Sequence, residues 1–325
     1  MIMKKNTNRT GRFKKSVAAV LSMALMLSMT VLLPGCKAKG FGKDADGKVK
    51  VLASIYPMYD FVKRIGGDYV AVSMMVPAGT EPHAWEPSTQ DMMKLEEADL
   101  FVYNGAGMET WAEDVLKGVQ NKKLTVLEAS SGLGLLVISE DDEHEGEGHH
   151  HVEFDPHVWL SPNFAAQEMK NIAEALKKID PAHASDYDKN YQLAKDECDK
   201  LDSEYRTALK NSDGQYIVVA HEAYGYLCME YELRQMGIEG VSADQEPDAA
   251  RMREIIDLVK QYNVKCIFFE ELVNPKVAQA IADETGCSTQ ALSPLDGMTQ
   301  ADIDAGRDYF SVMRDNLAAI QKALN

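Results

Sequence analysis

Three of the eight histidines stand in settings that suit metal binding. His83 follows a predicted strand in a segment rich in proline and glycine, and His221 comes directly after an apolar strand. His157 lies in a turn that flanking prolines hold stiff, where Asp155 could orient its imidazole. Asp296 follows the last predicted strand. Ligands of α/β folds bind beyond the carboxyl ends of the strands, so we expect these residues to converge. Three imidazoles and one carboxylate are a plausible tetrahedral set for Zn²⁺.

A second group of histidines lies in an acidic segment, residues 139–151, that contains no apolar residue. Such a segment cannot bury itself in a core, so we expect a solvated loop. We interpret it as an auxiliary metal-collecting loop that carries His144, His149, His150 and His151. Protonation of these imidazoles would weaken that loop's grip on metal below about pH 6.

Strand and helix signals alternate along two stretches of the chain, which favours parallel sheets covered by helices. The first stretch predicts strands at 50–55, 69–75, 100–103 and 124–127. The second predicts strands at 216–220, 265–269 and 289–292, a strand that starts at Val241, and a helix over 223–235. The fold class is therefore α/β, with two β-α lobes that each contain a parallel four-stranded sheet.

One long helix between the two stretches has apolar residues at alternating spacings of four and three, which place them on one face. At ~1.5 Å per residue it would be about 40 Å long, enough to run along both lobes as a rigid connector. We therefore predict an N-terminal lobe at 50–182, a connecting helix at 183–212 and a C-terminal lobe at 213–325, with the metal site in the cleft between the lobes.

The N-terminus has the pattern of an export signal. A basic start is followed by an uncharged apolar stretch that ends at Gly35-Cys36, which resembles a bacterial lipobox. We predict a signal peptide at 1–35, a lipidated Cys36, and a tether at 36–49. An uncleaved membrane anchor is the alternative, and either anchor places the rest of the chain on the outer face of the cytoplasmic membrane, at the cell surface or in the periplasm.

Export also makes disulfides possible. Cys266 and Cys287 lie near the starts of two predicted strands, one helix apart, and could pair, or the cysteines could be buried thiols. The formal net charge of −17 suits a soluble protein that attracts cations, and it argues against binding of nucleic acid.

Five segments, taken in order, resemble motifs of the metal-specific substrate-binding lipoproteins of bacterial ABC importers, in the zinc-uptake branch. They are Gly79–Pro87, Asp155–Leu160, His221–Tyr226, Asp244–Ala250 and Pro294–Asp296. The resemblance implies that His83, His157, His221 and Asp296 are the zinc ligands, and that the two lobes move little about a hinge. It also implies a non-enzymatic monomer whose partners are an ABC permease and its ATPase.

Around the ligands, Glu222, Glu246 and Glu270 could orient the imidazoles. Three alternatives stay open from the sequence. Manganese members of the family place Glu where this chain has His221, so a manganese or iron importer component is less favoured. A zinc hydrolase would need an open metal position and a nearby base, and no His-Glu-x-x-His motif appears. A surface adhesin with a structural metal is the third, and adhesion could coexist with transport.

Overall fold

The computed structural model describes residues 41, 45–138, 153–241 and 247–325, and residues 40–325 form one compact unit. Two four-stranded sheets organise this unit, and every strand pair within them is parallel. The first sheet has the order β2-β1-β3-β4, and the second has the order β10-β9-β7-β8. Their strands are β1 Val49–Ala53, β2 Val70–Met74, β3 Leu100–Tyr103 and β4 Thr125–Glu128, then β7 Tyr216–Val219, β8 Arg234–Gly237, β9 Cys266–Phe269 and β10 Ser288–Ala291.

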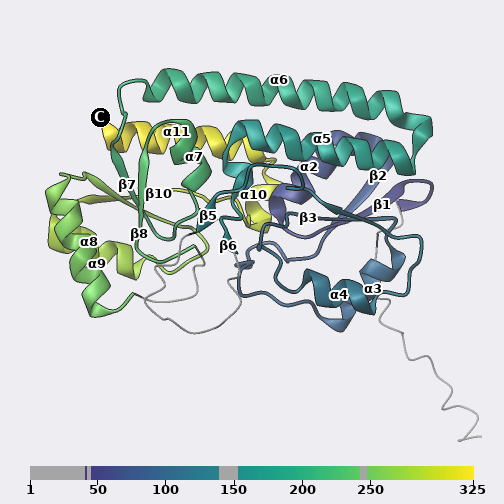
Figure 1. Cartoon of the computed structure of the whole chain (residues 1–325), viewed down its shortest axis with the longest axis horizontal. Helices are drawn as coiled ribbons and strands as arrows, with labels where there is room; N and C mark the ends of the chain where they lie inside the picture. Colours follow the sequence, from purple (N-terminus) through teal and green to yellow (C-terminus); the bar gives the residue numbers. More distant parts are fainter. Residues whose placement is uncertain (1–40, 42–44, 139–152, 242–246) are drawn as a thin grey trace, which may run out of the picture. The chain divides into compact units, whose positions relative to one another are not determined.

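Helices cover the sheets, and several begin or end at residues whose chemistry explains the boundary (Figure 1). Ser88 and Asp91 form a reciprocal capping box at the start of α3, and Asp308 caps α11. Gly286 ends α9 in the left-handed conformation that glycine adopts without steric penalty. The helices are α2 Tyr56–Gly66, α3 Thr89–Glu97, α4 Ala112–Gly118, α5 Pro162–Ile179, α6 Ala184–Leu209, α7 Gly225–Glu230, α8 Ala249–Gln261, α9 Lys276–Thr285, α10 Gln300–Asp304 and α11 Tyr309–Leu324.

The long helix α6 contains 26 residues and runs along both lobes, beside α5 and α11 (Figure 1). Its buried residues form the predicted stripe, which includes Tyr187, Ala194, Cys198, Leu201 and Tyr205. The Tyr205 hydroxyl donates to the carbonyl oxygen of Met313 in α11 at 2.7 Å, which ties the connecting helix to the second lobe. Two parallel four-stranded α/β lobes joined by one long helix are therefore confirmed.

A shared apolar core also joins the lobes directly. The indole Nε1 of Trp159 donates to the Pro294 carbonyl at 2.7 Å, and the Tyr309 hydroxyl donates to the Trp159 carbonyl at 2.7 Å. The Tyr309 ring meets Phe61 edge to face, with 5.0 Å between centroids. All three aromatic side chains are fully buried, so a hinge motion between the lobes would have to break apolar contacts and buried hydrogen bonds together.

Two predictions in the second lobe are wrong. The helix predicted over 223–235 ends at Glu230, and Glu232 has a φ of 57°, which a continuing helix does not allow. The strand predicted to start at Val241 lies earlier instead, at Arg234–Gly237, where it pairs with β7. In the first lobe, α4 begins at Ala112, after a loop in which three consecutive residues, Gly105, Ala106 and Gly107, have positive φ.

The described cysteines are free thiols, so the structure differs from the disulfide weighed for Cys266 and Cys287. The register explains the difference, because Ser288 and not Cys287 lies opposite Cys266. Successive side chains of a strand point to opposite faces. Cys266 accordingly packs in the core shared by the lobes, whereas Cys287 packs with a separate cluster of the second lobe.

Some predictions lie outside the described residues. They concern the signal peptide, Cys36, Glu246 and the four histidines of the acidic loop. A short antiparallel pair, β5 Val137–Ile138 with β6 Glu153–Phe154, joins the two segments that flank that loop, and the sequence did not predict it. None of the described helices combines the length and apolar character that a membrane span requires. The predicted lobe boundaries stay predictions.

Candidate metal centre

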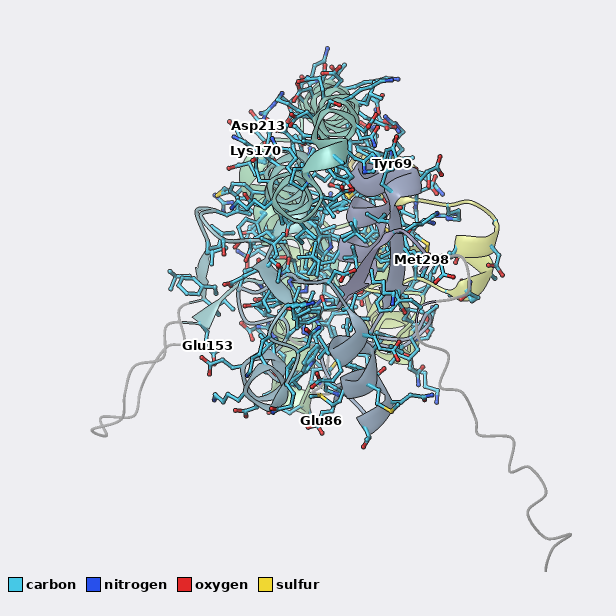
Figure 2. All side chains as sticks on the ribbon, turned by 90° about the vertical axis from the view of Figure 1, so that its right-hand side faces the viewer. Tyr69, Glu86, Glu153, Lys170, Asp213 and Met298 are labelled. Atoms are coloured by element: carbon cyan, nitrogen blue, oxygen red, sulfur yellow. The ribbon has the colours of Figure 1, made fainter. Side chains whose placement is uncertain are left out.

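His83 lies on the loop between β2 and α3, and Glu81, two residues earlier, shapes that loop. The carboxylate of Glu81 accepts hydrogen bonds from the backbone amides of His83 and Ala84, at 3.1 and 3.2 Å. The Gly79 amide donates to the carbonyl oxygen of Met298 at 2.8 Å, where the chain runs from β10 to α10. Figure 2 labels Met298 at the right of the view, beside the yellow segment near the C-terminus. The loop is therefore held by both lobes, which fixes where the His83 ring can point.

His157 is fully buried in the turn before α5, and Asp155 holds it in two ways. Asp155 Oδ1 accepts from the His157 backbone amide at 2.9 Å, and it lies 2.9 Å from the ring Nδ1. Asn104 Nδ2 donates to the Pro156 carbonyl at 2.9 Å, so the end of β3 supports the same turn. With Nδ1 donating to a carboxylate, Nε2 carries the free lone pair that a metal needs.

His221 and Asp296 come from the second lobe, each just beyond the carboxyl end of a strand. His221 follows β7, and its Nδ1 lies 2.6 Å from Oε1 of Glu270, which follows β9. Asp296 follows β10, and its Oδ1 accepts from the Gly297 amide at 2.7 Å, which leaves Oδ2 free. The preceding Leu295 has a φ of 61°, a sharp turn that aims Asp296. His221, Glu270 and Asp296 are all buried.

The four predicted ligands converge on one point. One donor atom from each of His83, His157, His221 and Asp296 lies within 4.8 Å of every other. His157 Nε2 is 3.3 Å from His83 Nε2 and 3.3 Å from His221 Nε2, and His83 Nε2 is 3.9 Å from Asp296 Oδ2. Ligands placed tetrahedrally at roughly 2.0–2.1 Å from a zinc ion lie about 3.3–3.4 Å from one another. The distances from His157 Nε2 to the other two nitrogens are therefore those of a zinc tetrahedron.

Burial and neighbouring charges set the protonation of the cage. Burial lowers the pKa of His83 to about 3, and burial together with the nearby His221 lowers the pKa of His157 well below its ordinary value. Burial acts the same way on His221, but the charge and hydrogen bond of Glu270 outweigh it and raise its pKa to about 9. Burial raises the pKa of Asp296 to about 7. Two imidazoles are thus neutral and ready to coordinate, and a cation would displace a proton from the third.

The proposed supporting glutamates separate in the structure. Glu270 contacts a ligand histidine, whereas Glu222 is half-buried, lies 3.9 Å from Arg251 and acts through its charge on Asp155. Two other residues that hold the cage were not predicted. The Tyr226 hydroxyl donates to the Asp155 carbonyl at 2.7 Å, and Gly225 approaches the Asp155 carboxylate so closely that a Cβ there would lie 2.4 Å from Oδ2. The only sequence signal for them was their place just after His221.

Comparison with known proteins gives the same picture. The family described as the periplasmic zinc-uptake complex component A matches residues 51–323. A zinc-binding protein AdcA of Streptococcus pyogenes serotype M6 is 40% identical over 290 residues, which span 85% of this chain and 56% of that relative. The chain therefore spans little more than half the length of this relative.

Two solved structures of streptococcal proteins share the fold. The Zn(II)-bound ZnuA-like domain of Streptococcus pneumoniae AdcA matches with a TM-score of 0.73 and 35% identity, over 86% of this chain and 99% of that one. The laminin-binding protein Lmb of Streptococcus agalactiae, described as bifunctional with adhesin and metal transporting activity, matches with a TM-score of 0.75 and 37% identity, over 86% of this chain and all of that one.

Two α/β lobes that share one core around a buried set of imidazoles and a carboxylate define a solute-binding protein for a metal ion. The match over residues 51–323 then makes the family plain: this chain belongs to the zinc-uptake complex component A family. That family consists of solute-binding components and not of enzymes.

Proposed function

We propose that this protein binds one Zn²⁺ ion as cargo, through His83, His157, His221 and Asp296, and delivers it to an ABC importer. The observation that carries the proposal is the spacing of the three Nε2 atoms, at 3.3 Å from His157 to each of the other two. Two of the rings have their Nδ1 atoms on carboxylates, which directs their Nε2 atoms toward one point. Without metal, the proton on His221 Nε2 faces His157, and a zinc ion would take the place of that proton.

Zinc is the favoured cargo because of the donor types. Imidazole suits Zn²⁺, whereas Mn²⁺ prefers harder oxygen ligands. The cage offers three imidazole nitrogens and a single carboxylate. Manganese or iron is the alternative cargo, and it would bind this set more weakly than zinc.

Delivery requires a partner, because the lobes share one core. The buried bonds between Trp159, Pro294 and Tyr309 hold the cleft in one conformation, so the ion does not leave through free hinge motion. We infer that a permease with its ATPase accepts the loaded protein and opens the cleft. A lipid on Cys36 would keep the protein beside that permease, and the acidic histidine loop would collect zinc before the cage.

The experiment is growth of a deletion strain in zinc-depleted medium. The proposal predicts poor growth that added zinc restores at concentrations where manganese does not. A plasmid carrying His157→Ala should fail to restore growth, whereas His183→Ala should restore it, because His183 lies on the connecting-helix side, bonded to Asp180 at 2.6 Å. Normal growth of the deletion strain in low zinc would contradict the transport role and favour an adhesin with a structural metal.

A further inference from the structure

Beside the turn that carries His157, buried oxygen atoms gather without hydrogen-bond partners. Among the described residues, Glu168 Oε1 and Oε2, Asn104 Oδ1 and Ser130 Oγ have no partner. Glu168 and Asn104 are 0% exposed, and Ser130 is 2% exposed. A buried polar atom without a partner is unfavourable, and most such atoms in native proteins bond to protein or to ordered water. These atoms therefore point to a bound group.

The three residues lie at one edge of the first sheet. Asn104 follows β3 and Ser130 follows β4, and the Ser130 amide donates to the Asn104 carbonyl at 3.0 Å. Helix α5 covers this edge, because Asn171 Nδ2 donates to the carbonyls of Ala129 and Ser131 at 2.8 and 3.1 Å. Glu168 lies three residues before Asn171, on the same face of α5. Its carboxyl group lies near Glu109, which accepts from the Asn104 amide, so it faces the end of β3.

A second buried carboxylate nearby is already saturated. Glu109 accepts hydrogen bonds from the Ser54 hydroxyl and from the amides of Asn104 and Gly105, the latter two at 2.9 Å. Burial raises the pKa of Glu109, and these three donors act against that rise because they stabilise an ionised carboxylate. Neither Glu109 nor Glu168 forms an ion pair with any described Lys or Arg. Burial and the charge of Glu109 raise the pKa of Glu168 well above its ordinary value.

We propose that Glu168, Asn104 and Ser130 form a buried binding site for ordered water, and that this site positions the His157 turn through the Asn104 side chain. A neutral Glu168 and the Ser130 hydroxyl have one hydrogen each to donate, but none of the four oxygen atoms has a partner within hydrogen-bonding distance among the described residues. Water supplies the missing donors, and a buried water usually makes about three hydrogen bonds in a polar site of this kind.

The link to the metal cage runs through the amide of Asn104. Its Nδ2 donates to the Pro156 carbonyl at 2.9 Å, one residue before His157, and also to the Gly105 carbonyl at 2.8 Å. Water bound at Oδ1 fixes the amide in the orientation that keeps Nδ2 on Pro156. Glu168 is thus a positioning residue, which acts on His157 through water and Asn104 without touching the ligand.

The other titratable groups that face Glu168 from packed elements are phenols. Tyr226 of α7 and Tyr309 of α11 both have their pKa values raised, mainly by burial and in part by Glu168. Both are neutral at physiological pH, so negative charge in this group can come only from the carboxyl groups of Glu109 and Glu168. Because the pKa of Glu168 is higher in the folded chain, the unfolded chain loses this proton at a lower pH. The stability that a neutral Glu168 contributes is therefore lost as the pH rises from the unfolded pKa through the folded pKa.

Two substitutions of Glu168 test the site, with Glu174→Met on the exposed face of α5 as the control. Glu168→Gln keeps the shape of the side chain and a hydrogen-bond donor. Glu168→Met keeps a similar size but removes the donor and both oxygen atoms. We expect Glu168→Gln to bind zinc within about two-fold of the wild type, and its metal-free stability, measured by urea unfolding, to fall less than that of the wild type as the pH rises above the ordinary pKa of a glutamate. Glu168→Met should weaken zinc binding about ten-fold, as loss of outer support does at metal sites.

A crystal structure of the metal-free wild type at atomic resolution should show water bonded to Asn104 Oδ1 and Glu168. The inference is overturned if that density is a sodium or calcium ion, or if no solvent is found there. It is also overturned if the stability of the protein depends on added sodium or calcium and Glu168→Gln abolishes that dependence. Zinc affinity of Glu168→Met equal to the control overturns the positioning role. The zinc readout rests on the proposed function, but the crystallographic and stability readouts use metal-free protein, so failure of zinc binding in the wild type would be a separate result.

Discussion

Replacing Glu270 with glutamine tests how the second lobe prepares its histidine for a cation. Glu270 Oε1 lies 2.6 Å from His221 Nδ1, and both side chains are buried. Glutamine can still accept the hydrogen bond from Nδ1, so Glu270→Gln removes the charge and keeps the geometry. The matched control is Glu271→Gln, because Glu271 is the next residue and is exposed.

The magnitude follows from the electrostatics of His221. Glu270 outweighs the effect of burial and raises the pKa of His221 from 6.5 to about 9, a net preference of about 3 kcal/mol for positive charge on the ring. A zinc ion on Nε2 also places positive charge on the ring, so it gains from the same carboxylate. Loss of such outer partners weakens metal binding by about 10- to 100-fold, or roughly 1.4–2.7 kcal/mol.

The assay is competition for Zn²⁺ against a chromophoric chelator at fixed pH, with the wild type and both variants stripped of metal. We expect Glu270→Gln to bind zinc about 10- to 100-fold more weakly and Glu271→Gln to match the wild type within about two-fold. If Glu270→Gln binds as tightly as the control, the carboxylate does not prepare His221 for the ion and this reasoning fails.

Three further substitutions probe the supports of the cage and of the core. Gly225→Ala would place a Cβ 2.4 Å from Asp155 Oδ2, so the zinc affinity of this variant should fall at least ten-fold. Gly240 has open space around it, so Gly240→Ala should leave the zinc affinity unchanged. Equal affinities of the two variants would contradict the close approach. Tyr226→Phe removes the bond to the Asp155 carbonyl, so urea unfolding should show a loss of about 1–3 kcal/mol, and an unchanged midpoint would refute the bond's role. Burial raises the pKa of Asp60 to about 6, so the contribution of Asp60 to stability falls as the pH rises from 4 through 6. The free energy of unfolding of Asp60→Asn should therefore gain about 1–3 kcal/mol relative to the wild type between pH 4 and pH 7. A difference in unfolding free energy that stays constant over this range would contradict the shift.

The fold was largely predictable because its elements carry strong local signals. The stripe of α6 and the apolar runs of β1, β3, β7 and β9 each specify a buried face, and the structure places them as expected. The errors lie where the signal is weak. Arg234–Gly237 contains no β-branched residue, so β8 owes its existence to pairing with β7 and not to its own propensity.

The candidate site was predictable for a different reason. His83, His221 and Asp296 all follow strands of parallel sheets, and such strand ends meet at one edge of each sheet. The supports could not be predicted in the same way. Tyr226 and Asn104 reach the His157 turn from residues 71 and 52 positions away in the chain, and only tertiary packing makes these pairs neighbours.

The central claim is that the cage of three imidazoles and one carboxylate selects zinc as cargo. Its most direct test is calorimetric titration of the metal-stripped chain that starts after Cys36, with Zn²⁺ and with Mn²⁺, beside a His221→Ala variant. We predict tight binding of about one zinc equivalent, weak manganese binding and a large loss of zinc affinity in the variant. Manganese binding equal to or tighter than zinc binding, or a variant that binds zinc as tightly as the wild type, would contradict the claim.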